Sequence, residues 1–339
     1  MSIPGKIVFV GDTHLSANTP SSRKETNEEY RALQIKKLKY IYEDLTDKDD
    51  WVIILGDVFH SSALSMMSGT PKFYNDIIDI MKSRRTLTII GNHDMYYRNE
   101  DSHNVTILDN LFKTGVEHLE HESLYISDGD SNKTINIYGV DYGHYFPKLE
   151  SNSNDFNIIV AHSFFEDRFY GAEGNSNLTE SAIEQLGQYD LVVLGHDHAA
   201  YPITTANNGK TIVVRPGSLL RGTSHTCQIN RIPQVAVLDT ETLECKYEVL
   251  PVAPGKEVFK EKVILEKDID VNVENILENM SSFDRTQSIY QFIKSQETRG
   301  KEVFGDRYYD VINIIEQYLD TFGIIKGGSK WQYNNIENI

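Results

Sequence analysis

Short runs of apolar, β-branched residues recur along the first 250 residues, separated by longer stretches with helical spacing. The runs predict buried strands at residues 7–10, 51–55, 86–90, 134–138, 157–160, 191–194 and 211–214. Between them, residues 31–45 and 72–81 carry apolar side chains at the spacing of an amphipathic helix. Such alternation predicts an α/β layered fold in which sheet lies between helices.

Nearly every predicted strand ends in a polar cluster. The clusters are Gly11-Asp12-Thr13-His14, Gly56-Asp57, Gly91-Asn92-His93-Asp94, Ala161-His162 and Gly195-His196-Asp197-His198. Active sites of α/β proteins lie at the carboxyl ends of buried strands, where loops carry polar side chains. The sequence therefore predicts a site built from these strand ends.

Aspartate, asparagine and histidine together indicate a divalent metal such as Mn²⁺, because they offer carboxylate, amide oxygen and imidazole but no thiolate. Each cluster alone is weak. Asp-x-His is common by chance, a single histidine at a strand end is more often a hydrogen-bonded structural residue, and Asn-His-Asp beside glycine is equally typical of a turn. The succession of such clusters, each after an apolar strand, favours a metal centre.

Composition is that of a soluble globular protein, with 339 residues, 40% hydrophobic and 24% charged. This length suits one large α/β domain and a smaller appendage. The two cysteines, Cys227 and Cys245, provide no disulfide framework or zinc–thiolate cluster. No apolar run approaches the roughly 20 residues that span a bilayer, and the amino terminus lacks the pattern of a secretory signal. We therefore expect a cytoplasmic protein without membrane contact, in the host cytoplasm if the chain is phage-encoded.

The net charge of −17 is unusual for a protein that binds nucleic acid, since Lys and Arg normally contact phosphates. An acidic surface keeps a protein soluble and discourages nonspecific DNA binding. Bound cations would offset this charge where a phosphate sits, and a basic partner could supply the rest. Composition by itself does not indicate DNA.

The pattern changes at residues 251–255, where two prolines and a glycine interrupt it. A strand-like segment over 257–265 follows, then helical patterns near 273–280 and 308–318, and a loose tail from about residue 327. We predict a main domain over residues 1–250, a small α+β cap over 251–300 and a helical segment with tail over 301–339.

The polar clusters, in order, resemble the motifs of the calcineurin-like metallophosphoesterase superfamily from residue 7 to about 240. The resemblance implies a four-layer α/β/β/α sandwich with a dinuclear site. It assigns one cation to Asp12, His14, Asp57 and His198, and the other to Asp57, Asn92, His162 and His196. Asp57 then bridges, as two cations roughly 3.5–4 Å apart require. We expect Mn²⁺, with Mg²⁺ as the alternative.

Three further residues are candidates for catalysis rather than metal binding. By resemblance, His93 acts on the substrate, where an imidazole stabilises charge or protonates the leaving oxygen. Asp94 is predicted to orient His93, as carboxylates do in other catalytic pairs. His60 is a candidate substrate-side residue, with a purely structural role weighed equally.

Finer features resemble the SbcD-type (meiotic-recombination-eleven) nucleases. Gly56-Asp57-Val58-Phe59-His60 is similar to that family's second motif, and Pro216-Gly217-Ser218-Leu219-Leu220-Arg221 to its later tract, with Arg215 in place of the usual aromatic. The proline-rich junction resembles the entry to that family's DNA-binding cap. Compactness favours a phage or bacterial member.

The SbcD resemblance implies a DNA nuclease, with 3′–5′ exonuclease activity on duplexes and endonuclease activity on single strands. It also implies a role in recombination, repair and replication. The expected partners are DNA, an SbcC-type coiled-coil ATPase contacted by an apolar stripe near residues 308–322, and a second copy of the chain. Dimer contacts are expected from residues 72–81 and 104–112.

Other functions compete with the nuclease. A metallophosphatase or cyclic-nucleotide phosphodiesterase of the same superfamily is the main alternative. Phosphoprotein phosphatases usually carry Glu where this chain has Asp94, and they need arginines near the metals, for which Arg98 and Arg221 are candidates. A noncatalytic scaffold is disfavoured because every ligand position is filled. A P-loop ATPase is disfavoured because the chain has no Gly-x-x-x-x-Gly-Lys-Ser/Thr motif.

Overall fold

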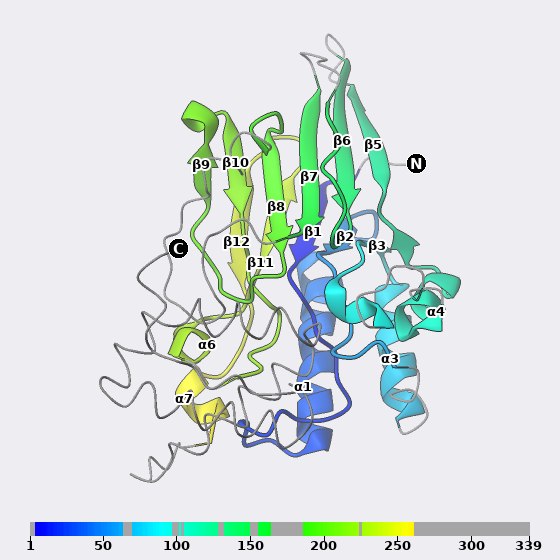
Figure 1. Ribbon diagram of the computed structural model, residues 1–339, viewed down its shortest axis with the longest axis vertical. Helices are drawn as coiled ribbons and strands as arrows, with labels where there is room; N and C mark the ends of the chain where they lie inside the picture. The colour runs from blue at the N-terminus through cyan, green and yellow to red at the C-terminus, as the bar shows by residue number, and fades with distance from the viewer. Residues whose placement is uncertain are drawn as a thin grey trace, which may run out of the picture. The chain divides into compact units, whose positions relative to one another are not determined.

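Two six-stranded sheets form the centre of the part of the chain that the computed structural model describes (Figure 1). The described residues are 4–63, 70–96, 102, 105–127, 132–149, 155–163, 186–223 and 226–260. The chain divides into two units, Met1–Glu261 and Lys262–Ile339, and the second unit lies outside the described residues.

The first sheet has the order β12-β11-β1-β2-β3-β4. Its strands are β1 (Lys6–Val10), β2 (Trp51–Ile54), β3 (Arg85–Thr88), β4 (Glu117–His118), β11 (Gln234–Asp239) and β12 (Cys245–Val249). Strands β1 to β4 run parallel, whereas β11 pairs antiparallel with both β1 and β12. The parallel order places the ends of β1, β2 and β3 side by side at one edge.

The second sheet has the order β5-β6-β7-β8-β10-β9. Its strands are β5 (His121–Ser127), β6 (Asn132–Val140), β7 (Phe156–His162), β8 (Leu191–Gly195), β9 (Thr204–Ala206) and β10 (Thr211–Val214). Strands β6, β7, β8 and β10 are parallel, and β5 and β9 close the two edges in antiparallel register. In register, His162 at the end of β7 lies beside Gly195 at the end of β8.

Several helices pack on one face of the first sheet through a shared apolar cluster. The helical elements are α1 (Asn27–Lys39), η1 (Tyr40–Leu45), α3 (Pro71–Met81), η2 (Asn92–Asp94), α4 (Ile107–Lys113), η5 (Asn207–Gly209), α6 (Thr226–Asn230) and α7 (Gly255–Val258). Helix α1 begins with a capping box, in which Thr26 accepts from the Glu29 amide and the Glu29 side chain accepts from the Thr26 amide.

Alternate residues of the first-sheet strands pack on opposite faces. Ile7, Phe9 and Ile53 pack against the second sheet, with Ile137 and Val160 among their neighbours in the same apolar cluster. The intervening residues, Val8, Val10, Val52 and Ile54, pack against α1, α3 and α4. Because both faces are buried, the strands read as continuous apolar runs in the sequence.

The predicted α/β sandwich is confirmed by two mixed sheets with flanking helices. All of the strands predicted from apolar runs are present. The two predicted helical stretches correspond to α1 with η1 and to α3. The strand-like segment predicted from residue 257 is wrong at its start, since Glu257 and Val258 belong to helix α7. Residues 261–339, with the remainder of the predicted cap and the partner-binding segment, lie outside the described residues. Among the helices that the structure describes, none is long and apolar enough to cross a membrane.

Candidate metal centre

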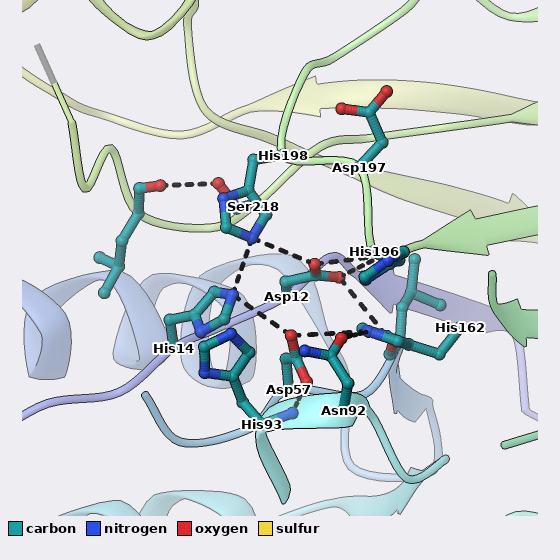
Figure 2. Close-up of polar contacts among 12 residues, drawn as sticks. Asp12, His14, Asp57, Asn92, His93, His162, His196, Asp197, His198 and Ser218 are labelled. Atoms are coloured by element: carbon teal, nitrogen blue, oxygen red, sulfur yellow. Dashed lines mark hydrogen bonds and ion pairs between the residues drawn. The ribbon is translucent and has the colours of Figure 1, made fainter. Parts of the chain in front are cut away.

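The ends of β1, β2, β3, β7 and β8 bring the predicted metal ligands into one cluster (Figure 2). The clustered residues are Asp12, His14, Asp57, Asn92, His162, His196 and His198. Backbone hydrogen bonds join the loops that carry them, and the amide of His14 donates to the carbonyl of Asp57 at 2.9 Å. The strand ends therefore converge as the sequence predicts.

One set of ligands surrounds the first candidate cation position. Asp12, His14, Asp57 and His198 each offer a ligand atom, and these atoms all lie within 4.8 Å of one another. The Nε2 atoms of His14 and His198 are 2.8 Å apart, and His198 Nε2 lies 3.5 Å from Asp12 Oδ2. Two imidazoles and two carboxylates thus point at a common centre.

A second set surrounds the other position, and Asp57 belongs to both. Asp57, His162 and His196 offer ligand atoms within 4.8 Å of one another. Asn92 joins them, because its Oδ1 lies 3.1 Å from His162 Nε2. Asp57 Oδ2 is 3.5 Å from His162 Nε2 and also 3.5 Å from His14 Nε2. This oxygen therefore occupies the place of a bridging ligand.

The backbone adopts a rare conformation at several of these residues. His14, Asp57 and His196 have positive φ angles of 42°, 49° and 81°. Positive φ is uncommon for residues other than glycine and costs free energy, so it persists where the surrounding structure enforces it. Its concentration on candidate ligands indicates a backbone shaped to aim these side chains.

Two glycines make the approach of the loops possible. A Cβ on Gly91 would lie 2.2 Å from Asp57 Oδ1, and one on Gly56, where φ is +83°, would lie 2.7 Å from His162 Nδ1. The atoms that the added Cβ would meet belong to ligand side chains, which cannot move away without leaving the cluster. Glycine is therefore required at both positions by the site itself.

Burial and mutual attraction set the charges in the cluster. Burial lowers the pKa of His198 to about 4 and the pKa of His14 well below its ordinary value. Burial disfavours the carboxylate form of Asp57 and the imidazolium form of His162. The neighbouring imidazoles nevertheless hold the pKa of Asp57 well below its usual range. Asp57 and Asp12 in turn raise the pKa of His162 to about 10. His14 and His198 are therefore neutral near pH 7, the form in which imidazole binds a metal.

The donor set fits two divalent cations. It contains carboxylate, amide oxygen and imidazole, which suit Mn²⁺ and related ions, and it has a carboxylate oxygen between the two positions. The groups also have the support that metal ligands usually receive. His162 Nδ1 lies 2.7 Å from the carbonyl of Leu55, and the amide of His196 donates to Asp12 at 3.0 Å.

The sequence also matches a known protein family. The family described as calcineurin-like phosphoesterase matches residues 5–200, which is more than half of the chain. The chain belongs to the calcineurin-like phosphoesterase family. No curated protein matches this chain.

Several solved structures resemble this calcineurin-like phosphoesterase. A putative 5′-nucleotidase from Staphylococcus aureus is 15% identical with a TM-score of 0.42, and the match covers 81% of this chain and 58% of that one. A 5′-nucleotidase precursor from Thermus thermophilus is 12% identical with a TM-score of 0.39, covering 81% and 59%. The NAD nucleotidase of Haemophilus influenzae is 13% identical with a TM-score of 0.39, covering 93% and 60%. The chain thus spans less than two thirds of each of these proteins, and at such scores they add nothing to the family assignment.

The predicted substrate-side residues of the phosphoesterase lie beside the first cation position. The ring of His93 is 4.9 Å from that of His14, and the ring of His60 is 5.7 Å from it. His60 and His93 stack at 5.8 Å, and His93 Nδ1 lies 3.1 Å from the carbonyl of His60. A carbonyl only accepts, so Nδ1 carries a proton and Nε2 is the ring nitrogen left for proton exchange.

Asp94 has a different role from the one predicted. It does not orient His93: its Oδ1 accepts from the amide of Val58 at 3.1 Å and its Oδ2 from the amide of Gly91 at 2.9 Å. Burial, with Asp57 nearby, raises the pKa of Asp94 to about 8. Asp94 therefore ties the loop after β2 to the loop after β3, and the carbonyl of His60 is the partner of His93.

Two arginines of interest, Arg221 and Arg215, are buried in this phosphoesterase. Arg221 donates to the carbonyl of Ala253 and so does not reach the cations, and Arg98 lies outside the described residues. Arg215, which replaces an aromatic of the resembled nucleases, stacks its guanidinium 4.0 Å from the ring centre of Tyr201. Arg215 thus makes a cation–π contact with Tyr201.

One residue at the centre was missed by the sequence reasoning. The ring of Tyr142 lies 5.4 Å from that of His196 and 6.1 Å from that of His162. Tyr142 follows β6 closely, so the rule that polar residues at strand ends form the site would have found it. Its contacts with both rings help to hold them at the second cation position.

Proposed function

We propose that this chain hydrolyses a phosphodiester of nucleic acid with the help of two divalent cations. The observation that carries the hydrolysis is the position of Asp57 Oδ2, which lies 3.5 Å from an imidazole of each ligand set. Two cations bound there would neutralise charge on a phosphate and lower the pKa of an attacking water. Side chains of the protein would orient the substrate and protonate the leaving oxygen.

His93 is proposed as the residue that acts on the leaving oxygen. Its Nδ1 donates to the carbonyl of His60, which fixes the plane of the ring and leaves Nε2 for the substrate. When His93 is cationic, Nε2 can donate a proton to the leaving oxygen. His60, stacked on it, completes the imidazole surface next to the first cation position.

The position of Arg221 supports a diester rather than a monoester. A phosphomonoester dianion is normally gripped by arginine, which forms two parallel hydrogen bonds. Arg221 is committed to the carbonyl of Ala253, and near the ligand sets the described residues present imidazoles to the substrate. A phosphodiester carries one negative charge and needs less cationic contact.

The SbcD resemblance supports the more specific proposal that the substrate is DNA and the cation Mn²⁺. An SbcC-type ATPase and a second copy of this chain are the partners proposed on the same basis. Helices α3 and α4, which correspond to the expected dimer segments, are both present. Sedimentation at micromolar concentration tests the dimer, and a monomer there would contradict it.

A nucleotide phosphatase or cyclic-nucleotide phosphodiesterase is the second candidate. The family shown here is defined by phosphoester hydrolysis in general, and none of the structures named above is a nuclease. The same two ligand sets would serve either reaction. Substrate tests therefore have to include both classes.

The deciding experiment offers purified protein duplex DNA, single-stranded DNA, a nucleoside 5′-monophosphate and a cyclic nucleotide, each with Mn²⁺, Mg²⁺ or EDTA. We expect Mn²⁺-dependent cleavage of DNA that is abolished in Asp57→Asn and retained in Asp44→Asn, an exposed carboxylate on η1. Turnover of the small substrates alone would transfer the function to the second candidate.

A further inference from the structure

A single turn next to the metal centre has all of its carbonyls bound by buried cationic side chains. The turn is Ser218–Arg221, and the donors are Arg23, Lys37 and Arg231. Lys37 Nζ donates to the carbonyl of Leu219 at 2.7 Å, and Arg23 Nη1 donates to the carbonyl of Arg221 at 2.6 Å. We call this turn the brace.

Arg231 makes the largest share of these contacts. Its Nη1 donates to the carbonyl of Ser218, and its Nη2 lies 3.0 Å from both the carbonyl of Leu220 and the hydroxyl of Ser218. The same Nη2 is 3.0 Å from Gln228 Oε1. One planar guanidinium thereby fixes the brace and the side chain of α6 beside it.

Two backbone amides of the brace donate to backbone carbonyls of candidate metal ligands. The amide of Leu219 donates to the carbonyl of Asp12 at 3.0 Å, and the amide of Ser218 donates to the carbonyl of His198 at 3.3 Å. Gln228 Nε2 also donates to the carbonyl of His198, at 3.3 Å. Figure 2 shows Ser218 next to His198. The brace therefore links the buried cations to the backbone of Asp12 and His198.

Both of these ligands belong to the same cation position. Asp12 and His198 are members of the first ligand set and not of the second. In the second set, Asn92 belongs to the loop that Asp94 ties to the loop after β2, and His162 lies against the carbonyl of Leu55. These contacts of Asn92 and His162 run through other groups than the brace, and His196 is linked to the first set by the hydrogen bond from its amide to the Asp12 carboxylate.

Burying these cations is costly, and carbonyls repay less of that cost than carboxylates would. Lys37 and Arg231 are only 3% and 7% exposed. The guanidinium of Arg231 also acts electrostatically on His198, so it opposes a cation bound there. Burying Lys37 and Arg231 at this place is therefore unfavourable in itself. It is explained if the conformation that these side chains impose on the brace is needed by the site.

We propose that Lys37 and Arg231 are positioning residues for the cation of the first ligand set, acting through the brace on Asp12 and His198. The inference rests on the proposed dinuclear centre. It assigns these residues no contact with substrate. Groups that hold metal ligands in place typically change metal affinity by about 10–100-fold when they are removed.

The test measures Mn²⁺ binding by isothermal titration and by the electron paramagnetic resonance signal of free Mn²⁺. We compare the unaltered chain with Lys37→Met, Arg231→Met and Arg231→Lys. Methionine at position 37 keeps most of the length of the lysine side chain and removes the buried amino group, so this variant should fold even if Arg231→Met does not. Arg84→Met is the control, because the partly buried Arg84 likewise donates to a backbone carbonyl, that of Thr46, which is outside the brace and both ligand sets.

We expect two Mn²⁺ per unaltered chain, and in Lys37→Met and Arg231→Met one affinity weakened at least about tenfold with the other unchanged. Arg231→Lys should recover part of the loss, and Arg84→Met should lower stability without changing either affinity. Unchanged affinities in the Lys37 and Arg231 variants would overturn the inference. Equal weakening of both sites, in the control as well, would also overturn it. An unaltered chain that binds no Mn²⁺ would instead refute the dinuclear centre itself.

Discussion

Asn92 and His93 are neighbours in the short helix η2, yet their side chains serve different purposes. Asn92 lies against His162 in the second ligand set, whereas His93 lies against His14 and His60. The amide of His93 donates to Asp57 Oδ1 at 2.7 Å, so its backbone supports the bridging carboxylate while its ring remains at the substrate side. Changing only the ring should therefore separate catalysis from metal binding.

The variant His93→Gln tests this separation. It keeps the backbone amide that supports Asp57 but removes a titratable group, so we expect turnover to fall by roughly 10²–10⁴-fold, the usual contribution of a general acid or base. Bound Mn²⁺ should stay at the level of the unaltered chain. Metal content by elemental analysis, alongside turnover number, gives the answer. Asp57→Ala is the counterpart that should lose both, and loss of metal from His93→Gln as well would remove the proposed division of roles.

At the residue scale, the sequence pattern pointed to the candidate metal ligands but not to the hydrogen bonds that hold the surrounding loops in place. Each ligand directly follows an apolar strand, so local pattern was enough to find Asp12, Asp57 or His162. Asp94 was assigned to His93 by analogy with other catalytic pairs, whereas its carboxylate accepts from the amide of Val58, 36 positions away. Lys37 meets Leu219 across 182 positions, and no local pattern records such a contact.

At the scale of elements, a charged pair joins β4 to the end of β6. His118 Nε2 lies 2.9 Å from Asp141 Oδ2, and Asp141 Oδ1 also accepts from the amide of Ile90. The hydrogen bond to Asp141 raises the pKa of His118 above its ordinary value. A raised pKa means that the folded state favours the protonated form. The pair should therefore stabilise the fold fully below about pH 6.5, and this stabilisation should disappear as pH rises through the folded pKa.

Urea unfolding of the unaltered chain and His118→Gln, in metal-free buffer at pH 5.5 and pH 9, measures this effect. We expect the stability difference between the two proteins to be larger at pH 5.5, and to stay below about 1 kcal/mol because the pair is partly exposed. His121→Gln, which removes an exposed histidine of β5 that stacks on Tyr138, is the matched control for the loss of an imidazole. A difference that grows toward pH 9 would contradict the assignment.

Most strands buried on both faces were predictable and the strands at the sheet edges were not. Strand β11 is the exception among the described strands, because residues 235–238 form a buried apolar run inside the first sheet and were still missed. Strands such as β2 and β8 are entirely buried, so they appear as apolar runs. Strand β12, with Lys246 and Glu248 alternating with half-buried residues, carries no such run and was missed together with β5 and β9. The helix α7 was read as a strand because its four residues are too few to show a helical period.

At the scale of the whole molecule, the metal centre joins the two sheets. Ligands from β1 and β2 belong to the first sheet and His162, His196 and His198 to the second, so bound cations would cross-link the sandwich. Without cations, Asp12 and Asp57 are buried carboxylates whose mutual repulsion adds to the effect of burial in raising the pKa of Asp12. Cations therefore relieve an electrostatic cost as well as adding ligand bonds, and the folded state should gain stability when they bind.

Thermal unfolding with EDTA and with increasing Mn²⁺ tests this consequence. A ligand that binds only the folded state contributes about 2.7 kcal/mol at 100 times its dissociation constant, which corresponds to a rise in Tm of roughly 5–10 °C for a domain of this size. In Asp57→Asn the rise should vanish, because both ligand sets lose their shared member. Asp44→Asn should behave as the unaltered chain. If Mn²⁺ raised Tm equally in Asp57→Asn, the cations would be binding elsewhere on the acidic surface, and the strand-end cluster would not be the metal centre.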